Sequence, residues 1–177
     1  GCRPKCLYHD EDGQWLVKFR HTYAPMDMGV QEYHCNQLAR RCGIEVPDFK
    51  LLNDTYFASK RFDISSDGRP LHMATAAALL NENIYPPKTD YKVLLALTGY
   101  ITQSPAEVEQ MFRRMVFNVL IGNKDDHAKN FSFVHRDDGW HLAPAYDLTR
   151  CVHGYNGEHA TSVMGHGKPS EADMIAA

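Results

Sequence analysis

The segment that most constrains the fold is a capped apolar helix that runs directly into a block of polar residues. Ser104 begins a Ser-Pro-Ala-Glu capping box with proline at the first helical position, which predicts a helix over residues 104–122. Gly122 is its expected end, and its buried face is expected to comprise Val108, Met111, Phe112, Met115, Val116, Val119 and Leu120. Residues 123–130 then contain seven polar residues and one alanine. A buried helix therefore delivers this polar block to one place in the fold.

The first third of the chain has the pattern of a small sheet with one helix. The expected elements, in order, are strands at 6–9 and 15–19, a helix at 29–42, and a strand pair within 49–63. Asp27 is the expected N-cap of the helix, and Gly43 stands where the helix should stop.

The remainder is expected to be mainly helical, with one hairpin after the polar block. The pattern predicts helices at 73–81, 89–100 and 104–122, followed by strands at 131–134 and 140–142. The 177 residues, 44% of them hydrophobic, suffice for one sizeable core or for two small lobes that share a cleft. We therefore expect an α+β fold.

Charge and cysteine content narrow the classes of partner. With a net charge of -3 the chain has no basic bias, so we expect no direct nucleic-acid binding and no attachment to an anionic membrane. No apolar run reaches the roughly 18 residues that a membrane span needs. The five cysteines form no Cys-x-x-Cys pair, which favours reduced thiols in a cytoplasmic protein.

The spacing within the polar block indicates phosphoryl transfer. Asp125 and Asn130 are five positions apart, like the catalytic Asp and the metal-binding Asn of protein kinases, whereas Asp126 would give four. The reaction needs a carboxylate beside the acceptor hydroxyl, an oxygen ligand for Mg2+, and a second carboxylate on the metal. Asp147 follows the expected hairpin, where kinases carry that second carboxylate.

Lys18 and Glu32 supply the other half of the kinase pattern. Lys18 has apolar neighbours in an expected strand, which could hold its ammonium group over nucleotide phosphates. Glu32 lies on the following helix and could pair with Lys18.

Other readings of these residues stay open at the level of sequence. A capped polar turn would also explain Asp125 and Asn130, and a glutamate near a helix start is often only a partner of the helix dipole. We interpret Asp126 as a loop-stabilising neighbour and not as the base. The same polar groups would also serve a small-molecule or lipid kinase, or a nucleotide-binding regulator without turnover.

Several stretches of the sequence together resemble one family. Residues 120–132 include the run Gly-Asn-Lys-Asp-Asp-His-Ala-Lys-Asn, and residues 143–148 are Ala-Pro-Ala-Tyr-Asp-Leu. The chain opens with Gly-Cys-Arg-Pro-Lys, and further matches lie at 43–47 and 60–63. These motifs closely resemble those of the HipA-like family of bacterial toxin kinases, and the resemblance covers nearly the whole chain.

The resemblance implies a protein-kinase-like fold with two lobes. Residues 1–63 would form a small β-rich N-lobe with one helix. Residues 64–177 would form a mainly helical C-lobe with a β-hairpin beside the catalytic loop. The family's regulatory serine would lie before residue 1, so we interpret the chain as part of a longer protein.

The resemblance also implies roles for the residues of the polar block. Asp125 would be the catalytic base, and His127 would order the loop around it. Lys129 belongs to the same group of candidate catalytic residues. Asn130 and Asp147 would bind Mg2+.

ATP is the second cofactor that the resemblance implies. Its phosphates would contact Lys18, which pairs with Glu32, and Lys5 of the opening motif. The backbone that would receive the adenine belongs to Lys60, Arg61 and Phe62.

The resemblance finally implies a class of substrate and a partner. Members of this family phosphorylate translation enzymes, including aminoacyl-tRNA synthetases, and are silenced by an antitoxin or by autophosphorylation. We therefore expect an ATP- and Mg2+-dependent serine/threonine protein kinase with a protein substrate and an antitoxin partner.

Overall fold

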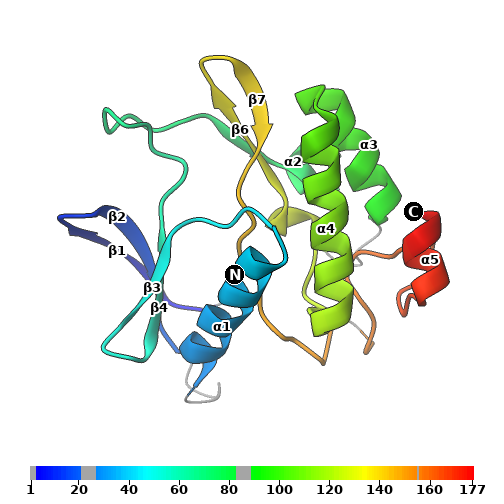
Figure 1. Cartoon of the computed structure of the whole chain (residues 1–177), viewed down its shortest axis with the longest axis horizontal. Coiled ribbons are helices and arrows are strands. Elements are labelled where there is room, and N and C mark those ends of the chain that lie inside the picture. The colour runs from blue at the N-terminus through cyan, green and yellow to red at the C-terminus, as the bar shows by residue number, and fades with distance from the viewer. Residues whose placement is uncertain (1–2, 21–26, 83–88, 155) are drawn as a thin grey trace.

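A four-stranded antiparallel sheet forms the N-terminal third of this computed structural model, which describes residues 3–20, 27–82, 89–154 and 156–177 (Figure 1). The strands are β1 (Lys5–Asp10), β2 (Gly13–Lys18), β3 (Phe49–Leu52) and β4 (Tyr56–Lys60), in the order β1-β2-β4-β3. Trp15, Val17 and Ala58 form its buried core. Both hairpins expected in this third of the chain are confirmed.

Helix α1 (Met28–Arg41) packs against β3 and β4. Gly29 permits this approach, because a Cβ atom at its position would lie 2.1 Å from the carbonyl oxygen of Thr55. Asp27 occupies the N-cap position, but its side chain makes no capping hydrogen bond. The carboxylate of Asp27 instead accepts a hydrogen bond from the side chain of Gln31. The expected N-cap position is therefore confirmed, although the side chain does not cap the helix.

A second, three-stranded sheet contains β5 (Met73–Thr75), β6 (Ser132–Arg136) and β7 (Gly139–Leu142). The β6-β7 hairpin is the one expected after the polar block. The helix expected over 73–81 is wrong in its first part, because the backbone of residues 73–75 pairs with β6. Helix α2 (Ala76–Leu79) begins only after Thr75, whose hydroxyl accepts a hydrogen bond from the N–H of Ala78.

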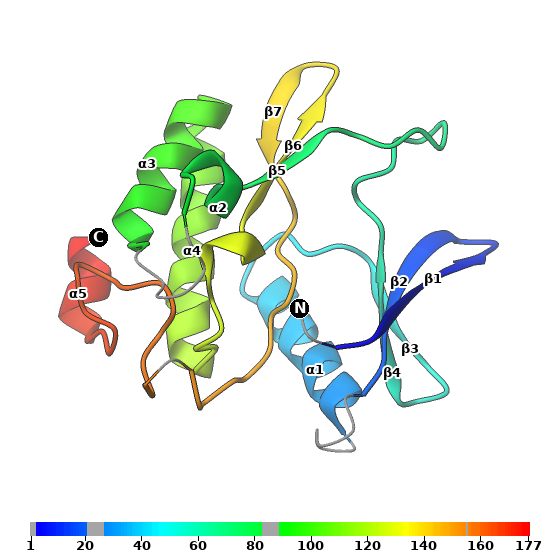
Figure 2. The ribbon, with the colours of Figure 1, turned by 180° about the vertical axis from the view of Figure 1, so that it is seen from behind.

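Helices α3 (Tyr91–Thr102) and α4 (Pro105–Ile121) lie side by side, with the short α5 (Glu171–Ala176) near the C-terminus (Figures 1 and 2). Helix α3 begins after Asp90, whose carboxylate caps the N–H of Lys92, and not at residue 89. None of the described helices is long and apolar enough to cross a membrane.

An apolar core lies between α3, α4 and the second sheet. Its fully buried members include Tyr91, Leu94, Met111, Met115 and Phe133. Leu120 is not among them, because it is 71% exposed, which contradicts the expected buried face. Met115 and Leu120 are five positions apart, so their side chains point about 140° apart around the helix.

The start of α4 is tied to the second sheet. Oγ of Ser104 accepts a hydrogen bond from the N–H of Glu107 at 3.4 Å, which is half of the expected capping box. The carboxylate of Glu107 does not return to the helix start. It accepts a hydrogen bond from the N–H of Leu142 at 2.5 Å and lies 2.9 Å from Nδ1 of His141. The capping glutamate therefore fixes β7 against α4.

A separate apolar cluster joins α1 to α4 and to the chain after β7. It contains Ala39, Ile44, Phe117, Ala145 and Leu148. The N–H of Ala145 also donates to the carbonyl oxygen of Glu45 at 2.8 Å. The segment 143–148 consequently runs between α1 and α4 (Figure 2).

We expect Met115→Ala to lower the free energy of unfolding by about 2–5 kcal/mol, because it removes a side chain that is 0% exposed. Leu120→Ala, on the same helix, should change this free energy by less than about 0.5 kcal/mol. Urea unfolding followed by circular dichroism measures both values. Equal losses for the two variants would contradict the assignment of the buried face.

Candidate active site

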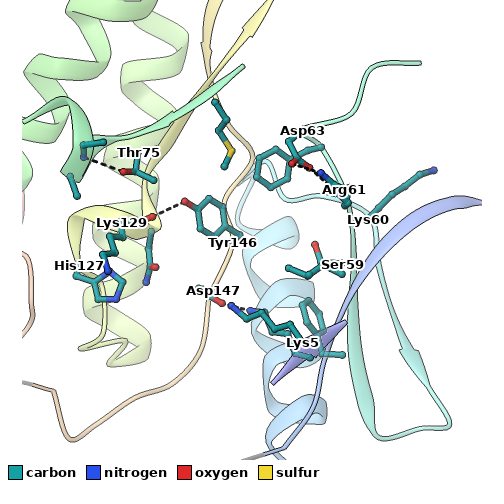
Figure 3. A pocket seen from close by; sticks show the side chains of 18 of the residues that line it. Lys5, Ser59, Lys60, Arg61, Asp63, Thr75, His127, Lys129, Tyr146 and Asp147 are labelled. Atoms are coloured by element: carbon teal, nitrogen blue, oxygen red, sulfur yellow. Dashed lines mark hydrogen bonds and ion pairs between the residues drawn. The ribbon is translucent and has the colours of Figure 1, made fainter. Parts of the chain in front are cut away.

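A cavity of about 1090 Å³ lies between the four-stranded sheet, α2 and the polar block (Figure 3). Apolar side chains of the sheet form part of its wall, among them Leu7, Leu16 and Phe57. Most of the candidate site residues line it, namely Lys5, Lys18, Lys60, Arg61, Phe62, His127, Lys129, Asn130 and Asp147. Asp125 and Glu32 are not among the lining residues.

Lys18 is the buried centre of the site. Its side chain, at the end of β2, is 5% exposed, and Nζ donates to Oε1 of Glu32 at 2.5 Å and to Oδ1 of Asp147. Glu32, on α1, is fully buried and also accepts a hydrogen bond from the guanidinium of Arg3. Burial alone would lower the pKa of Lys18, but the two carboxylates raise it above its ordinary value. The amine therefore stays charged.

Asp147 brings the segment after β7 to Lys18. Its φ of 55° lies in the left-handed region, which aspartate adopts more readily than most residues. Burial favours the neutral carboxylic acid, but Lys18 and two further cations lower the pKa of Asp147 to about 2. Asp147 is therefore ionised at neutral pH.

Asp125 has the opposite pKa shift. Its side chain is 64% exposed, yet neighbouring protein atoms remove enough water to raise its pKa. His127, with Nε2 3.7 Å from Oδ1 of Asp125, opposes this rise, and the charge of Asp147 adds to it. Two carboxylates whose pKa values move apart suit different roles, one as a proton acceptor and one as a permanent anion.

Asp126 holds the polar block in place from within the fold. It is fully buried and accepts hydrogen bonds from the hydroxyl of Tyr91 at 2.9 Å and from the N–H of Ala160 at 3.0 Å. Nδ1 of His159 lies 3.0 Å from the same carboxylate, and the hydroxyl of Thr161 donates to the Asp126 carbonyl oxygen at 2.5 Å. These are the contacts of a loop-stabilising residue, and Asp125 is the exposed member of the pair.

Asn130, His127 and Lys129 lie on the cavity wall. Nδ2 of Asn130 donates to the carbonyl oxygen of Asp125 at 2.8 Å, so the amide oxygen is the atom that remains for a cation. Nδ1 of His127 is buried and has no hydrogen-bond partner among the described residues. The Lys129 carbonyl oxygen accepts a hydrogen bond from the hydroxyl of Tyr146 at 2.8 Å, which fixes the end of the loop.

The segment expected to receive adenine contributes one aromatic surface to the cavity. The side chain of Lys60 extends away from the cavity in Figure 3, and Arg61 forms an ion pair of 2.7 Å with Asp63. The ring of Phe62 stacks on Tyr146 with centroids 5.8 Å apart and planes at 26°. Phe62 thus joins this segment to the residue that precedes Asp147.

The donor set of Asp147 and Asn130 fits a hard divalent cation. Carboxylate and amide oxygens are ligands that Mg2+ accepts. In the described ranges, no group of three or more His, Cys, Asp or Glu side chains is placed to hold a metal ion. Two oxygen ligands still suit Mg2+, which usually keeps water and substrate phosphates in its other positions.

Sequence reasoning missed three residues next to the site. Arg3 pairs with Glu32, while Gly1 and Cys2 of the same opening motif lie outside the described residues. Tyr146 bonds the end of the polar block. Arg114 is a fully buried cation on α4. A charged residue on an apolar helix face was the available signal for Arg114. The other two lie in the opening motif and in residues 143–148, but nothing local indicated their partners.

Comparison with known proteins identifies relatives over almost the full sequence. The family model described as the HipA-like C-terminal domain matches residues 1–176. The protein named "Putative kinase Y4dM" of Sinorhizobium fredii is 29% identical over 171 residues, covering 85% of this chain and 41% of its own length. The protein named "Putative kinase" of Haemophilus influenzae is 24% identical over 157 residues, covering 78% of this chain and 46% of its own length. The chain thus spans less than half of these relatives.

Two solved structures with a similar fold are a toxin-antitoxin complex and a kinase. HipA in the Shewanella oneidensis MR-1 complex of HipA, HipB and operator DNA has a TM-score of 0.80 and 19% identity, over 99% of this chain and 50% of that one. The Helicobacter pylori proinflammatory kinase CtkA has a TM-score of 0.61 and 21% identity, over 83% of this chain and 55% of that one. At these identities the likeness establishes the fold.

Asp126→Ala should lower the free energy of unfolding by at least about 3 kcal/mol, because several buried donors lose their acceptor at once. Asp125→Ala should cost less than about 1 kcal/mol, since the side chain is 64% exposed. Chemical unfolding of the two variants provides the measurement. A larger loss for Asp125→Ala would show that the roles of the neighbours are reversed.

Asp147 should contribute to stability only above strongly acidic pH. Its pKa falls from 3.8 to about 2 on folding, so the contribution is complete above pH 3.8 and is lost as pH falls through about 2. Asp147→Asn should therefore flatten the dependence of unfolding free energy on pH in that window. The exposed hairpin-tip variant Asp137→Asn is the control and should retain the slope of the unaltered protein.

Proposed function

This chain belongs to the family of HipA-like C-terminal domains, and from that premise we propose that it is the ATP- and Mg2+-dependent catalytic core of a serine/threonine protein kinase. The observation that carries the proposal is the contact of Lys18 with both Glu32 and Asp147. It joins a strand, a helix and a distant segment at the wall of a nucleotide-sized cavity. Kinases use a strand lysine, a helix glutamate and a metal-binding aspartate in this combination.

Asp147 and Asn130 are the proposed Mg2+ ligands, and Lys18 is the proposed partner of the nucleotide phosphates. When bound, ATP supplies the phosphoryl group and Mg2+ offsets the charge of its phosphates. The low pKa of Asp147 keeps its carboxylate available to a cation at neutral pH. Glu32 holds the ammonium group of Lys18 in position, and Arg3 offsets the second oxygen of that buried carboxylate.

Asp125 is the proposed proton acceptor for the hydroxyl group of the substrate. Its side chain is exposed, which leaves room for a protein acceptor beside it. Its raised pKa makes the carboxylate a better base than an ordinary aspartate. Residues 123–130 are called the catalytic loop below. His127 and Lys129 follow Asp125 in this loop, and we assign both to ordering the loop and orienting the substrate.

The adenine ring is proposed to lie against Phe62 and the apolar wall of the sheet. The N–H groups of Lys60 and Arg61 already donate to the carbonyl oxygens of Asp48 and Gln14. Recognition of adenine would therefore use carbonyl oxygens of this segment and the N–H of Phe62. In this proposal residues 1–63 and 64–177 act as two lobes around the nucleotide, with Lys5 near its phosphates.

The partner and the substrate of the whole protein are also proposals. Because HipA of Shewanella oneidensis forms a complex with HipB and operator DNA, we propose an antitoxin partner for the protein that contains this chain. We propose a serine or threonine hydroxyl on a protein of translation, such as an aminoacyl-tRNA synthetase, as the acceptor. The chain spans about half of its relatives, so these assignments concern the whole protein.

Asp125→Asn and Asp147→Asn should each reduce phosphoryl transfer from radiolabelled ATP by at least roughly 100-fold, because they remove the base and a metal ligand. Transfer should require Mg2+ and should be measured on a mixture of cytoplasmic proteins, followed by identification of the labelled residue.

Asp137→Asn, at the exposed tip of the β6-β7 hairpin, is the matched control and should retain full transfer. Undiminished labelling by folded Asp125→Asn and Asp147→Asn variants would refute the proposed roles. Label on a small molecule or lipid, with none on protein, would refute the proposed class of acceptor.

A further inference from the structure

A small internal cavity lies beneath the catalytic loop. Its volume is about 10 Å³, close to the space that one water molecule needs. The polar residues that line it come from α4, from the catalytic loop and from the segment after β7; they are Arg114, Asn118, Asn123, Asp126, Asn130 and Tyr146. Buried polar groups gathered in this way call for hydrogen-bond partners.

Arg114 presents an unpartnered donor in this region. The residue is 2% exposed, and burial lowers its pKa to about 10, so its guanidinium remains charged at neutral pH. Nε of Arg114 is buried and has no hydrogen-bond partner among the described residues. Glu45 and Glu107 act on the charge only through space. A buried N–H group without an acceptor is costly, so a partner for Nε is required.

Asn123 presents an unpartnered acceptor. Its Nδ2 donates to Oδ1 of Asn118 at 3.0 Å and lies 3.4 Å from the carbonyl oxygen of Asp147. Its Oδ1 is buried and lacks a hydrogen-bond partner within the described part of the chain. The two orphaned atoms are complementary, since Nε of Arg114 can only donate and Oδ1 of Asn123 can only accept. Both residues line the same cavity.

We propose that Arg114 and Asn123 bind one internal water molecule in this cavity, and that Arg114 is thereby a positioning residue for the catalytic loop. The water accepts a hydrogen bond from Nε of Arg114 and donates one to Oδ1 of Asn123. A cation is excluded by the guanidinium, and an anion is excluded by the adjacent carboxylate of Asp126. The occupant must therefore be a small neutral molecule that both donates and accepts hydrogen bonds, and water meets this requirement.

The water site connects α4 to both proposed Mg2+ ligands. Asn130 lines the cavity directly. Asp147 is reached through its carbonyl oxygen, beside the amide of Asn123. Loss of the water should therefore loosen the two ligands relative to each other without removing either. This positioning role rests on the proposed kinase function, whereas the water site itself does not.

The water site is tested by a high-resolution crystal structure of the protein. We expect an ordered water about 2.7–3.2 Å from both Nε of Arg114 and Oδ1 of Asn123. Arg114→Met should displace it. Arg113→Met, the matched change at the neighbouring exposed arginine, should leave the water in place. An empty cavity in the unaltered protein, or a direct bond from Nε to a side chain, would overturn the proposal.

The positioning role is tested by the Mg2+ dependence of phosphoryl transfer. Arg114→Met should raise the Mg2+ concentration for half-maximal rate several-fold and lower kcat by roughly tenfold, with KM for the acceptor unchanged. Arg114→Lys should restore part of the rate, because its ammonium group can occupy the position of the water. Arg113→Met should match the unaltered protein.

The outcomes separate the two proposals. If the unaltered protein transfers no phosphate, the kinase proposal fails, while the crystal structure still decides the water site. If Arg114→Met loses the water and keeps its Mg2+ dependence, the positioning role is wrong. Should Arg114→Met fail to fold, as judged by its thermal midpoint, Arg114→Lys decides. With its ammonium group in the position of the water, this variant should keep most of the Mg2+ dependence, and loss of that dependence would refute the role.

Discussion

The arrangement of the candidate site depends on the two ion pairs that Lys18 forms with Glu32 and Asp147. Removing charged groups from water is expensive, and a buried pair seldom stabilises a fold more than apolar side chains would. The guanidinium of Arg3 pairs with the second carboxylate oxygen of Glu32, so the cations Arg3 and Lys18 offset the anions Glu32 and Asp147. Such an arrangement requires β2, α1 and the segment after β7 to meet at one point. The apolar cluster that joins α1 to α4 also packs the segment after β7. Strand β2 contributes Trp15 and Val17 to the separate core of the four-stranded sheet.

Adjacent carboxylates in the catalytic loop have opposite environments. Asp126 is surrounded by donors from α3 and from residues 159–161, which anchor the loop to the helical part of the chain. Asp125 remains exposed and has a raised pKa. The loop is held at Asp126, and this anchoring presents the side chain of Asp125 in a defined position. Arg114 lines a cavity together with Asp126 and Asn130.

Much of the fold could be predicted because its signals are local. Turn residues and alternating apolar residues mark the hairpins, and the length and periodicity of α4 mark a buried helix. The failures have non-local causes. Residues 73–75 form a strand because β6, almost 60 positions later, offers them a partner. Glu107 leaves its capping box because the N–H of Leu142 competes for its carboxylate. A single sequence contains no measure of such competition.

The sequence by itself determined which chemical groups this protein has and in what order they follow a buried helix. Spacing and neighbouring residues were enough to identify the candidate site, because a five-residue loop interval and a strand lysine are local features. The residues identified in this way are Asp125, Asn130, Asp147, Lys18 and Glu32. Only the tertiary structure decided that Lys18 touches two carboxylates, that Arg3 shares Glu32, and that Arg114 is buried beneath the loop. These contacts join residues far apart in the chain, and their strength depends on how completely water is excluded. Burial of that kind is a property of the assembled fold and not of any segment.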